Sequence, residues 1–200
     1  SENDEYWLTG SKLDHIKRFH DLKNYDFKNK TVLEIGVGLG FMTKELVDTG
    51  AKIIASDISK VALKKISKSV YKTIHTSLLN TEEQVDLAIC HLVFQHCNDE
   101  EIHRLIRDVQ LKDDGIFTFQ FAFLYEEPNE KVKSLINNGM HHFRSIEKIK
   151  EMVDDSDKKI SFISNPIHFV GSVPNQKNNK INYMISDENV GWYIVNLEKK

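Results

Sequence analysis

Three glycines at alternate positions directly follow a short run of β-branched and aliphatic residues. The run is Thr31–Ile35, which includes an acidic residue, Glu34, and the glycines are Gly36, Gly38 and Gly40. A strand that ends in such a turn before a helix exposes backbone N–H groups, and the positive end of the helix dipole, to a ligand at the strand's tip. The pattern suits a cofactor that carries a nucleoside.

A second acid, Asp57, ends the next predicted strand, where a carboxylate can accept hydrogen bonds from both hydroxyls of a ribose. A dinucleotide-binding turn has the spacing G-x-G-x-x-G. Here the third glycine comes one residue early, at Gly40, and Phe41 stands in its place. The chain also has no Tyr-x-x-x-Lys dyad. These departures count against a nicotinamide cofactor, although an NAD(P)-dependent oxidoreductase remains the alternative.

Histidines could supply acid–base chemistry. His91 follows a predicted buried strand and His96 comes five residues later, and histidine is the usual base near neutral pH. For each, the competing interpretation is a hydrogen-bonding element of the loop that shapes the pocket. His141 and His142 with Arg144 form either a clamp on an anionic or polar acceptor or a solvated loop before a helix. No metal-site spacing such as H-E-x-x-H accompanies these residues, so we expect no metal.

The elements that must position these residues alternate along the first 155 positions. Apolar runs predict strands, and amphipathic stripes behind capping residues predict helices. The expected strands are 31–35, 52–56, 71–76, 85–90 and 115–124, and the expected helices are 41–49, 59–70 and 98–109, followed by one after Ser145. Such alternation predicts an α/β fold with a doubly wound, Rossmann-like and mostly parallel sheet.

Both ends of the chain differ from this pattern. Leu13, Ile16, Phe19 and Leu22 recur every three residues and predict a helix that lies on the main domain. After residue 155, strand follows strand, which predicts an antiparallel strand pair at the C-terminal end, at one edge of the sheet, with an exposed loop at 172–180. We expect the phenylalanines of the fifth strand, residues 117 to 123, to be core rather than an aromatic platform.

Length and composition set the remaining bounds. Two hundred residues with 40% hydrophobic content, 28% charged content and a net charge of −3 predict one soluble domain. Its parts are an N-terminal helical cap (1–29), a cofactor-binding core (30–125) and a substrate-side connection, helix and strands (126–200). Without a basic cluster we expect no nucleic-acid partner, and without a long apolar run no membrane partner. We expect a cytoplasmic monomer or homodimer.

The order and spacing of these motifs resemble the class I S-adenosylmethionine-dependent methyltransferases, and within them the small-molecule branch. The resemblance covers residues 30 to 125, and residues 143–149 resemble the helix that usually follows. It is carried by Glu34–Gly40, Ser56–Ser59, Val85–Cys90 with Val93–His96, and Gly115–Phe117.

The resemblance implies S-adenosyl-L-methionine as cofactor. By this resemblance Gly36, Gly38 and Gly40 would shape the turn around the methionine portion, with Glu34 near its amino-acid end. Asp57 would hold the ribose hydroxyls.

Three further contacts to the cofactor follow from the same resemblance. Ile58 would pack on the adenine ring, and His91 would lie beside the sulfonium. The family often has an aspartate after the third strand for the adenine amino group. This chain has Thr76-Ser77-Leu78 there, so we expect Ser77 or a backbone carbonyl to make that contact.

The implied reaction is methyl transfer to oxygen or nitrogen of a small molecule. A sugar or other precursor of a surface glycan is one acceptor class, suggested by analogy alone. His91 and His96 would act at the reacting atoms, and Tyr125, His141 and Arg144 would contact the acceptor. A non-catalytic module that binds S-adenosylmethionine is the other alternative.

Overall fold

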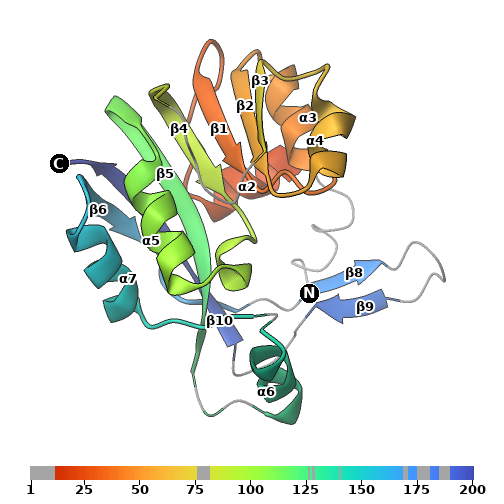
Figure 1. Ribbon diagram of the computed structural model, residues 1–200, viewed down its shortest axis with the longest axis vertical. Coiled ribbons are helices and arrows are strands. Elements are labelled where there is room, and N and C mark those ends of the chain that lie inside the picture. The colour runs from red at the N-terminus through yellow and green to blue at the C-terminus, as the bar shows by residue number, and fades with distance from the viewer. Residues whose placement is uncertain are drawn as a thin grey trace.

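One mixed sheet forms the centre of the molecule (Figure 1). The computed structural model describes residues 12–75, 82–125, 127, 129–139, 141–168, 171–174, 181–184 and 190–200. Within them the strand order is β3-β2-β1-β4-β5-β10-β6. The strands are β1 (Thr31–Ile35), β2 (Lys52–Asp57), β3 (Lys72–His75), β4 (Val85–Cys90), β5 (Leu111–Leu124), β6 (Lys158–Ile163) and β10 (Val190–Lys199).

Strands β1 to β5 pair in parallel, and β10 runs antiparallel to both β5 and β6. The α/β class and the mostly parallel sheet with an antiparallel C-terminal pair are therefore confirmed. In parallel strands the carboxyl ends meet at one edge of the sheet, so the residues that follow β1, β2 and β4 are brought together there.

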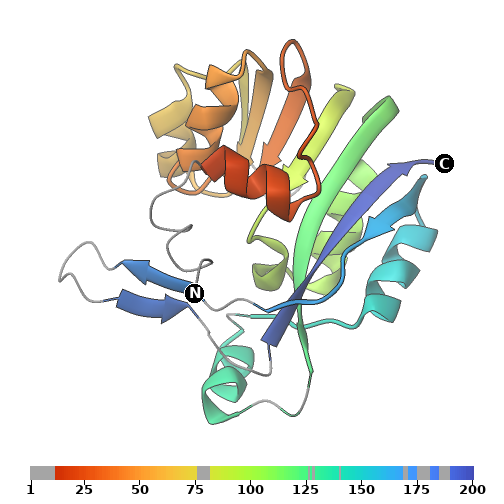
Figure 2. The same cartoon turned by 180° about the vertical axis from the view of Figure 1, so that it is seen from behind.

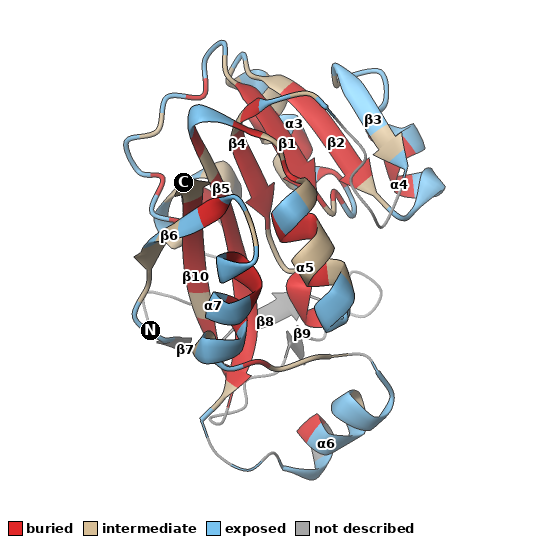
Figure 3. Ribbon diagram, turned by 60° about the vertical axis from the view of Figure 1, so that its left-hand side comes forward, coloured by how far each residue is buried: buried red, intermediate tan, exposed pale blue. Residues whose placement is uncertain are grey.

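Helices cover both faces of the sheet (Figures 1 and 2). Buried side chains of α2 and α3 pack on one face, and those of α5 and α7 pack on the other. The helices are α2 (Lys12–Phe19), α3 (Phe41–Asp48), α4 (Lys60–Ile66), α5 (Asp99–Asp108), α6 (Glu130–Asn137) and α7 (Ile146–Asp154). Figure 3 shows the central strands buried and the outer faces of the helices exposed.

The core under α5 and α7 contains the phenylalanines of β5. Phe117, Phe119, Phe121 and Phe123 are all buried in one cluster with side chains of both helices. Alternation places every second residue of a strand on one face. The prediction that this ladder is core is confirmed.

The start of α5 is fixed by its own sequence. The Glu101 N–H donates to Asn98 Oδ1 (2.9 Å), and the Asn98 N–H donates to Glu101 Oε2 (2.8 Å), which completes the predicted capping box. Because this helix begins two residues after Cys97, its cap also fixes the end of the loop that carries His91 and His96.

The C-terminal strands β10 and β6 form the predicted antiparallel pair at one edge of the sheet, with β6 as the edge strand. Strand β10 lies between β5 and β6, and the two-residue strand β7 (Ile167–His168) also pairs with it. Most of β10 is buried, and a strand with two apolar faces is stable only in the interior of a sheet.

The predicted loop 172–180 is partly a strand. Residues Gly171–Pro174 form β8, which pairs antiparallel with β9 (Ile181–Met184). Residues 175–180 lie outside the described residues.

Several expectations remain predictions. Residues 1–11 of the expected N-terminal cap lie outside the described residues, and the division into 1–29, 30–125 and 126–200 is not tested. Over the ranges that the structure describes, no helix has both the length and the apolar character needed to cross a bilayer. The cytoplasmic location and the oligomeric state stay predictions.

Candidate active site

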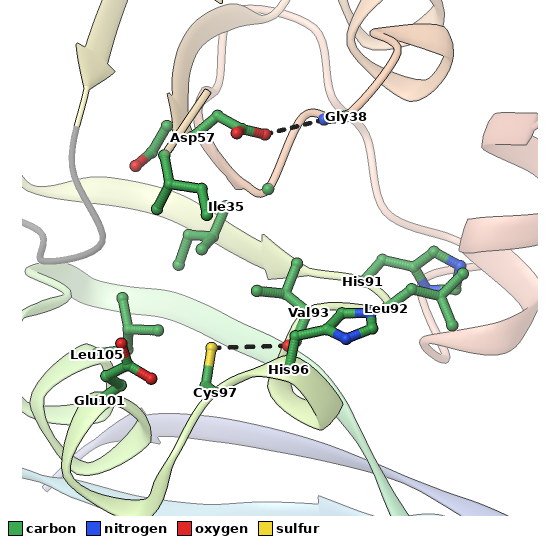
Figure 4. A pocket seen from close by; sticks show the side chains of 13 residues that line it. Ile35, Gly38, Asp57, His91, Leu92, Val93, His96, Cys97, Glu101 and Leu105 are labelled. Atoms are coloured by element: carbon green, nitrogen blue, oxygen red, sulfur yellow. Dashed lines mark hydrogen bonds between the residues drawn. The ribbon is translucent and has the colours of Figure 1, made fainter. Parts of the chain in front are cut away.

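A cavity of about 520 Å³ opens where β1, β2 and β4 end, beside the first turns of α5. Its volume lies in the range typical of cofactor pockets. Figure 4 shows Asp57 at one end of this cavity and the imidazoles of His91 and His96 at the other. Gly36, Gly38 and Ile58 also line it. The structure therefore brings six of the predicted site residues together.

The carboxylate of Asp57 is held in place by backbone donors. Its Oδ2 accepts from the Gly38 N–H (3.0 Å) and its Oδ1 from the Ser59 N–H (2.7 Å). A carboxylate has about four lone-pair sites, so both oxygens can still accept from a ligand. Ile58 is 71% exposed directly beside it and offers an apolar surface to a flat ring. This end of the cavity fits a nucleoside.

The glycine turn bends the chain beneath the cavity. Gly36 and Gly38 have φ values of +79° and +52°, a region that side chains with a Cβ rarely adopt. At Gly36 a Cβ would also collide with the Val93 side chain, which lines the cavity. Gly40 has a φ of +79° and caps the start of α3. The turn therefore needs glycine for both backbone shape and close approach.

Glu34 is buried on β1, one residue before the cavity wall begins. Burial raises its pKa to about 8, the Thr43 hydroxyl opposes this shift, and the charge of Asp57 adds to it. Within the described part of the chain its Oε2 has no hydrogen-bond partner. One oxygen of this buried carboxyl therefore lacks a hydrogen-bond partner, and a cationic donor of a ligand, such as an ammonium, would offset the loss of hydration of the ionised form.

The His91 ring lies against a histidine that the sequence analysis missed. His91 Nδ1 lies 3.1 Å from Nε2 of His20, and Nδ1 of His20 lies 2.7 Å from Oγ1 of Thr118. His20 is fully buried and immediately follows α2. The sequence did contain a signal for His20. It lies at helical spacing from Leu13 and Ile16, so it is a polar residue on the apolar face of the predicted helix.

His96 and His141 come together although 45 positions separate them. Their ring centroids are 5.0 Å apart. Burial lowers the pKa of His141, and His96 and His142 lower it further. A lower pKa favours the neutral imidazole, which cannot hold an anion by charge.

Arg144 is committed elsewhere. Its side chain is 4% exposed, and it donates to Asp99 Oδ1 (2.7 Å), to the Phe94 carbonyl (3.2 Å) and to the Cys97 carbonyl. The guanidinium thus ties the start of α7 to the loop after β4. We therefore replace the interpretation of an acceptor clamp by that of an anchor for the loop that carries His96.

Tyr125, which the sequence also predicted, is not among the residues that line the cavity. Tyr125 follows β5, and its ring centroid is 4.6 Å from that of Phe123. Its pKa is raised mainly by partial burial and to a smaller extent by the nearby Tyr193. Ser77 lies outside the described residues. Gln120, which the sequence analysis did not single out, is fully buried, and neither polar atom of its amide has a partner in the described chain.

Other reactive groups do not add chemistry here. Burial raises the pKa of the Cys97 thiol to about 11, which keeps it protonated. Among the residues that the structure describes, no three histidine, cysteine, aspartate or glutamate side chains are grouped closely enough to hold a metal ion.

Known proteins share this sequence pattern and this fold. Residues 32–115 match the family described as Methyltransferase domain. Phosphoethanolamine N-methyltransferase 1 of Triticum aestivum is 32% identical over 120 residues, which are 54% of this chain and 24% of the wheat protein. The chain therefore spans about a quarter of the length of this curated relative.

Two solved structures have the same fold. Phosphoethanolamine N-methyltransferase 2 of Haemonchus contortus, with S-adenosylhomocysteine bound, matches with a TM-score of 0.68 at 16% identity, over 97% of this chain and 56% of that one. Geranyl diphosphate C-methyltransferase of Streptomyces coelicolor A3(2) matches with a TM-score of 0.65 at 11% identity, over 94% and 76%. The sequence match, the strand order and the site at the ends of β1, β2 and β4 agree, and they count against the nicotinamide alternative. Over residues 32–115 the chain is therefore similar to the family described as Methyltransferase domain, and its fold is that of the two solved methyltransferases.

Proposed function

We propose that this chain transfers the methyl group of S-adenosylmethionine to an oxygen or nitrogen atom of a small molecule. The observation that carries the proposal is one cavity that has a backbone-held carboxylate at one end and two imidazoles at the other. The cofactor supplies an activated methyl group on a sulfonium, whose carbon–sulfur pair stays on sulfur when the methyl group leaves.

The residues of the chain would supply orientation and a proton acceptor. Asp57 would hold the ribose hydroxyls and Ile58 the adenine ring, so that the methyl group is directed at the histidine end. Holding two reactants in line can by itself contribute several kcal/mol. His91 or His96 would take the proton of the acceptor, which matters most when the acceptor is a hydroxyl.

The charges of the described site bear on the acceptor class. No lysine or arginine is found among the described residues that line the cavity, and Arg144 is already bonded to Asp99 and to backbone carbonyls. Imidazoles and a neutral His141 support an uncharged hydroxyl or amine acceptor, such as a sugar. The wheat and nematode relatives are named for phosphoethanolamine, a phosphorylated amine. Both acceptor classes therefore belong in a screen.

Ligand binding tests the cofactor. We expect S-adenosylhomocysteine, but not NADH, to raise the melting temperature, because a ligand at 100 times its Kd adds about 2.7 kcal/mol to the native state. Asp57→Ala should lose the shift, whereas Asp48→Ala, an exposed acid at the far end of α3, should keep it. Stabilisation by NADH instead, or a full shift in Asp57→Ala, would contradict the proposal.

Activity tests the reaction. Transfer of labelled methyl groups should be measured with sugars and sugar nucleotides in one arm and with ethanolamine and phosphoethanolamine in the other. Labelled product in either arm supports transfer and identifies the acceptor class. Binding of S-adenosylhomocysteine without turnover in either arm would favour the non-catalytic module.

A further inference from the structure

The loop that carries both cavity histidines contains one residue in a strained backbone conformation. Leu92, directly after His91, has a φ of +58°. A side chain with a Cβ rarely adopts this left-handed region, and leucine has no polar atom that could stabilise it locally, as asparagine does. Leu92 also lines the cavity, and Figure 4 shows it together with the imidazoles of His91 and His96. The strain therefore lies at the proposed site of reaction.

The neighbours of Leu92 explain why the chain turns there. Cys90 is the last residue of β4, so the path of the chain is fixed up to this point. Val93 packs so closely on Gly36 that a Cβ at the glycine would collide with it. Phe94 is fully buried in the core under α5. Between these fixed positions the chain has to turn sharply, and the positive φ falls on Leu92.

A buried glutamine holds this turn. Gln95 is 2% exposed, and its Nε2 donates to the Leu92 carbonyl (2.8 Å). The same nitrogen lies 3.4 Å from Nε2 of His96. The backbone of Gln95 is fixed in turn, because the His142 N–H donates to its carbonyl (2.7 Å). One side chain thus connects the strained residue to a supported part of the loop.

The orientation of the Gln95 amide follows from this partner. Only its NH₂ group can face the Leu92 carbonyl, because an amide oxygen there would oppose a second acceptor. Its Oε1 is consequently buried without a donor in the part of the chain that the structure describes. A buried oxygen without a partner lowers stability, so methionine, which has a similar shape, should fit the fold as well. What the amide adds is the bond to Leu92.

The strain at Leu92 and the bond that opposes it are similar in size. A left-handed conformation is disfavoured by about 5- to 30-fold for a residue with a Cβ. One net hydrogen bond favours a conformation by about 2- to 10-fold. Without the bond we expect the turn to relax in a large share of the molecules, and the histidines on both sides of it to shift.

We propose that Gln95 is a positioning residue whose amide holds Leu92 in the left-handed turn that places His91 and His96 at the reacting end of the cavity. The proposal rests on the proposed methyl transfer, in which one of these imidazoles takes the proton of the acceptor. Gln95 touches neither reactant and acts through the backbone of Leu92.

Hydrogen exchange of backbone amides measures the turn without turnover. The His96 N–H donates to the Val93 carbonyl (2.8 Å) and the Cys97 N–H to the Phe94 carbonyl (3.2 Å), so these two amides exchange when the loop opens. In Gln95→Met we expect both to exchange about 2- to 10-fold faster than in the wild type, which is the factor for one hydrogen bond. The melting temperature should change little, because the substitution also removes the unpartnered oxygen.

A matched control and a second-site variant separate positioning from packing. The side-chain amide of Gln110 also donates to a backbone carbonyl, that of Asp108 (3.4 Å), but Gln110 precedes β5 and lies at the opposite end of the sheet from the cavity. Gln110→Met should therefore leave the two loop amides unchanged. Glycine adopts the left-handed region without steric cost, so in a Leu92→Gly background Gln95→Met should accelerate exchange much less. Equal acceleration in both backgrounds would overturn the proposal.

Kinetics with the acceptor found in the screen give a second readout. Gln95→Met should lower kcat by about 2- to 10-fold. The Kd for S-adenosylhomocysteine should change little, because Asp57 lies at the other end of the cavity. Gln95→Asn, which is one methylene too short to reach the Leu92 carbonyl, should behave alike and replaces the methionine variant if that does not fold. An unchanged kcat in a variant whose loop exchanges faster would overturn the proposal.

The outcomes separate this proposal from the broader one. Unchanged exchange of the two loop amides in Gln95→Met overturns the positioning role whether or not the protein is active. Failure of the wild type to bind S-adenosylhomocysteine overturns the proposed function, whatever the exchange rates are.

Discussion

Replacing Glu34 by glutamine should remove a pH dependence from the stability of the ligand-free protein. Burial raises the pKa of Glu34 from its ordinary 4.5 to about 8. In the unfolded chain this carboxyl is ionised above about pH 4.5, whereas in the folded protein it stays protonated up to about pH 8. Between these two values folding takes up a proton, which becomes less favourable as the pH rises. Stability is therefore present at low pH and lost as the pH rises from 4.5 to about 8.

The size of the effect follows from the width of that pH window. Each pH unit within it changes the unfolding free energy by about 1.4 kcal/mol. Between about pH 5 and about pH 7.5 the wild type should lose roughly 3 kcal/mol more than Glu34→Gln. In a chain of 200 residues, that difference corresponds to about 6–12 °C in Tm.

Urea unfolding, followed by circular dichroism at several pH values, measures this difference. Glu82→Gln, at an exposed acid, controls for the loss of one carboxyl and should follow the wild type. Parallel pH curves for the wild type and Glu34→Gln would refute the reasoning from burial.

The same carboxyl gives a binding test. If the ammonium group of S-adenosylhomocysteine ionises Glu34, binding near pH 7 should release close to one proton, because the group is mostly protonated beforehand. Calorimetry in two buffers of different ionisation enthalpy counts that proton. No release from the wild type, or equal release from Glu34→Gln, would show that Glu34 does not pair with the ligand.

Three further changes test individual features of the fold by urea or thermal unfolding. Gly36→Ala should lower the unfolding free energy by about 2–3 kcal/mol, because the new Cβ collides with Val93 and because φ is positive. Gly139→Ala, at a positive φ with open space around it, should lower it by only about 1 kcal/mol. Equal losses in the two variants would refute the collision. Arg144→Met should destabilise by about 2–4 kcal/mol, because it leaves buried carbonyls without a donor, and Asp99→Asn should lose much less, since that side chain is 56% exposed. Gln120→Met should raise stability by about 1–2 kcal/mol, because it removes a buried amide without described partners; a lower Tm would contradict this.

The cofactor end of the site could be predicted because its shape is encoded locally. The glycine turn needs only the backbone freedom of Gly36 and Gly38 and the strand before them, all within Thr31–Gly40. Asp57 lies at the cavity because it ends a strand that is parallel to β1. Strand ends in a parallel sheet share one edge, so periodicity alone was enough to place these residues together.

The acceptor end could not be predicted in the same way. The sequence shows only that a basic residue precedes a helix. It does not show whether the guanidinium is free or, as in Arg144, hydrogen-bonded to the carbonyls of a loop almost 50 residues away. His20 was hidden for a related reason, since its partners lie after β4 and on β5. The interior place of β10 also depends on pairing between distant segments, which periodicity does not specify.

The family match divides the site in the same way. Residues 32–115 include the glycine turn, Asp57, His91 and His96, whereas His20, Thr118, His141 and Arg144 all lie outside that range. The two structural relatives act, by their names, on a phosphorylated amine and on a diphosphate, although both share this fold. The matched range therefore explains how a cofactor is held but carries little information about the acceptor. His91 belongs to the matched range and bonds to His20 outside it. For that reason, the effect of His20 variants on kcat, with cofactor affinity unchanged, would show whether the chain outside the family core tunes the chemistry or only completes the fold.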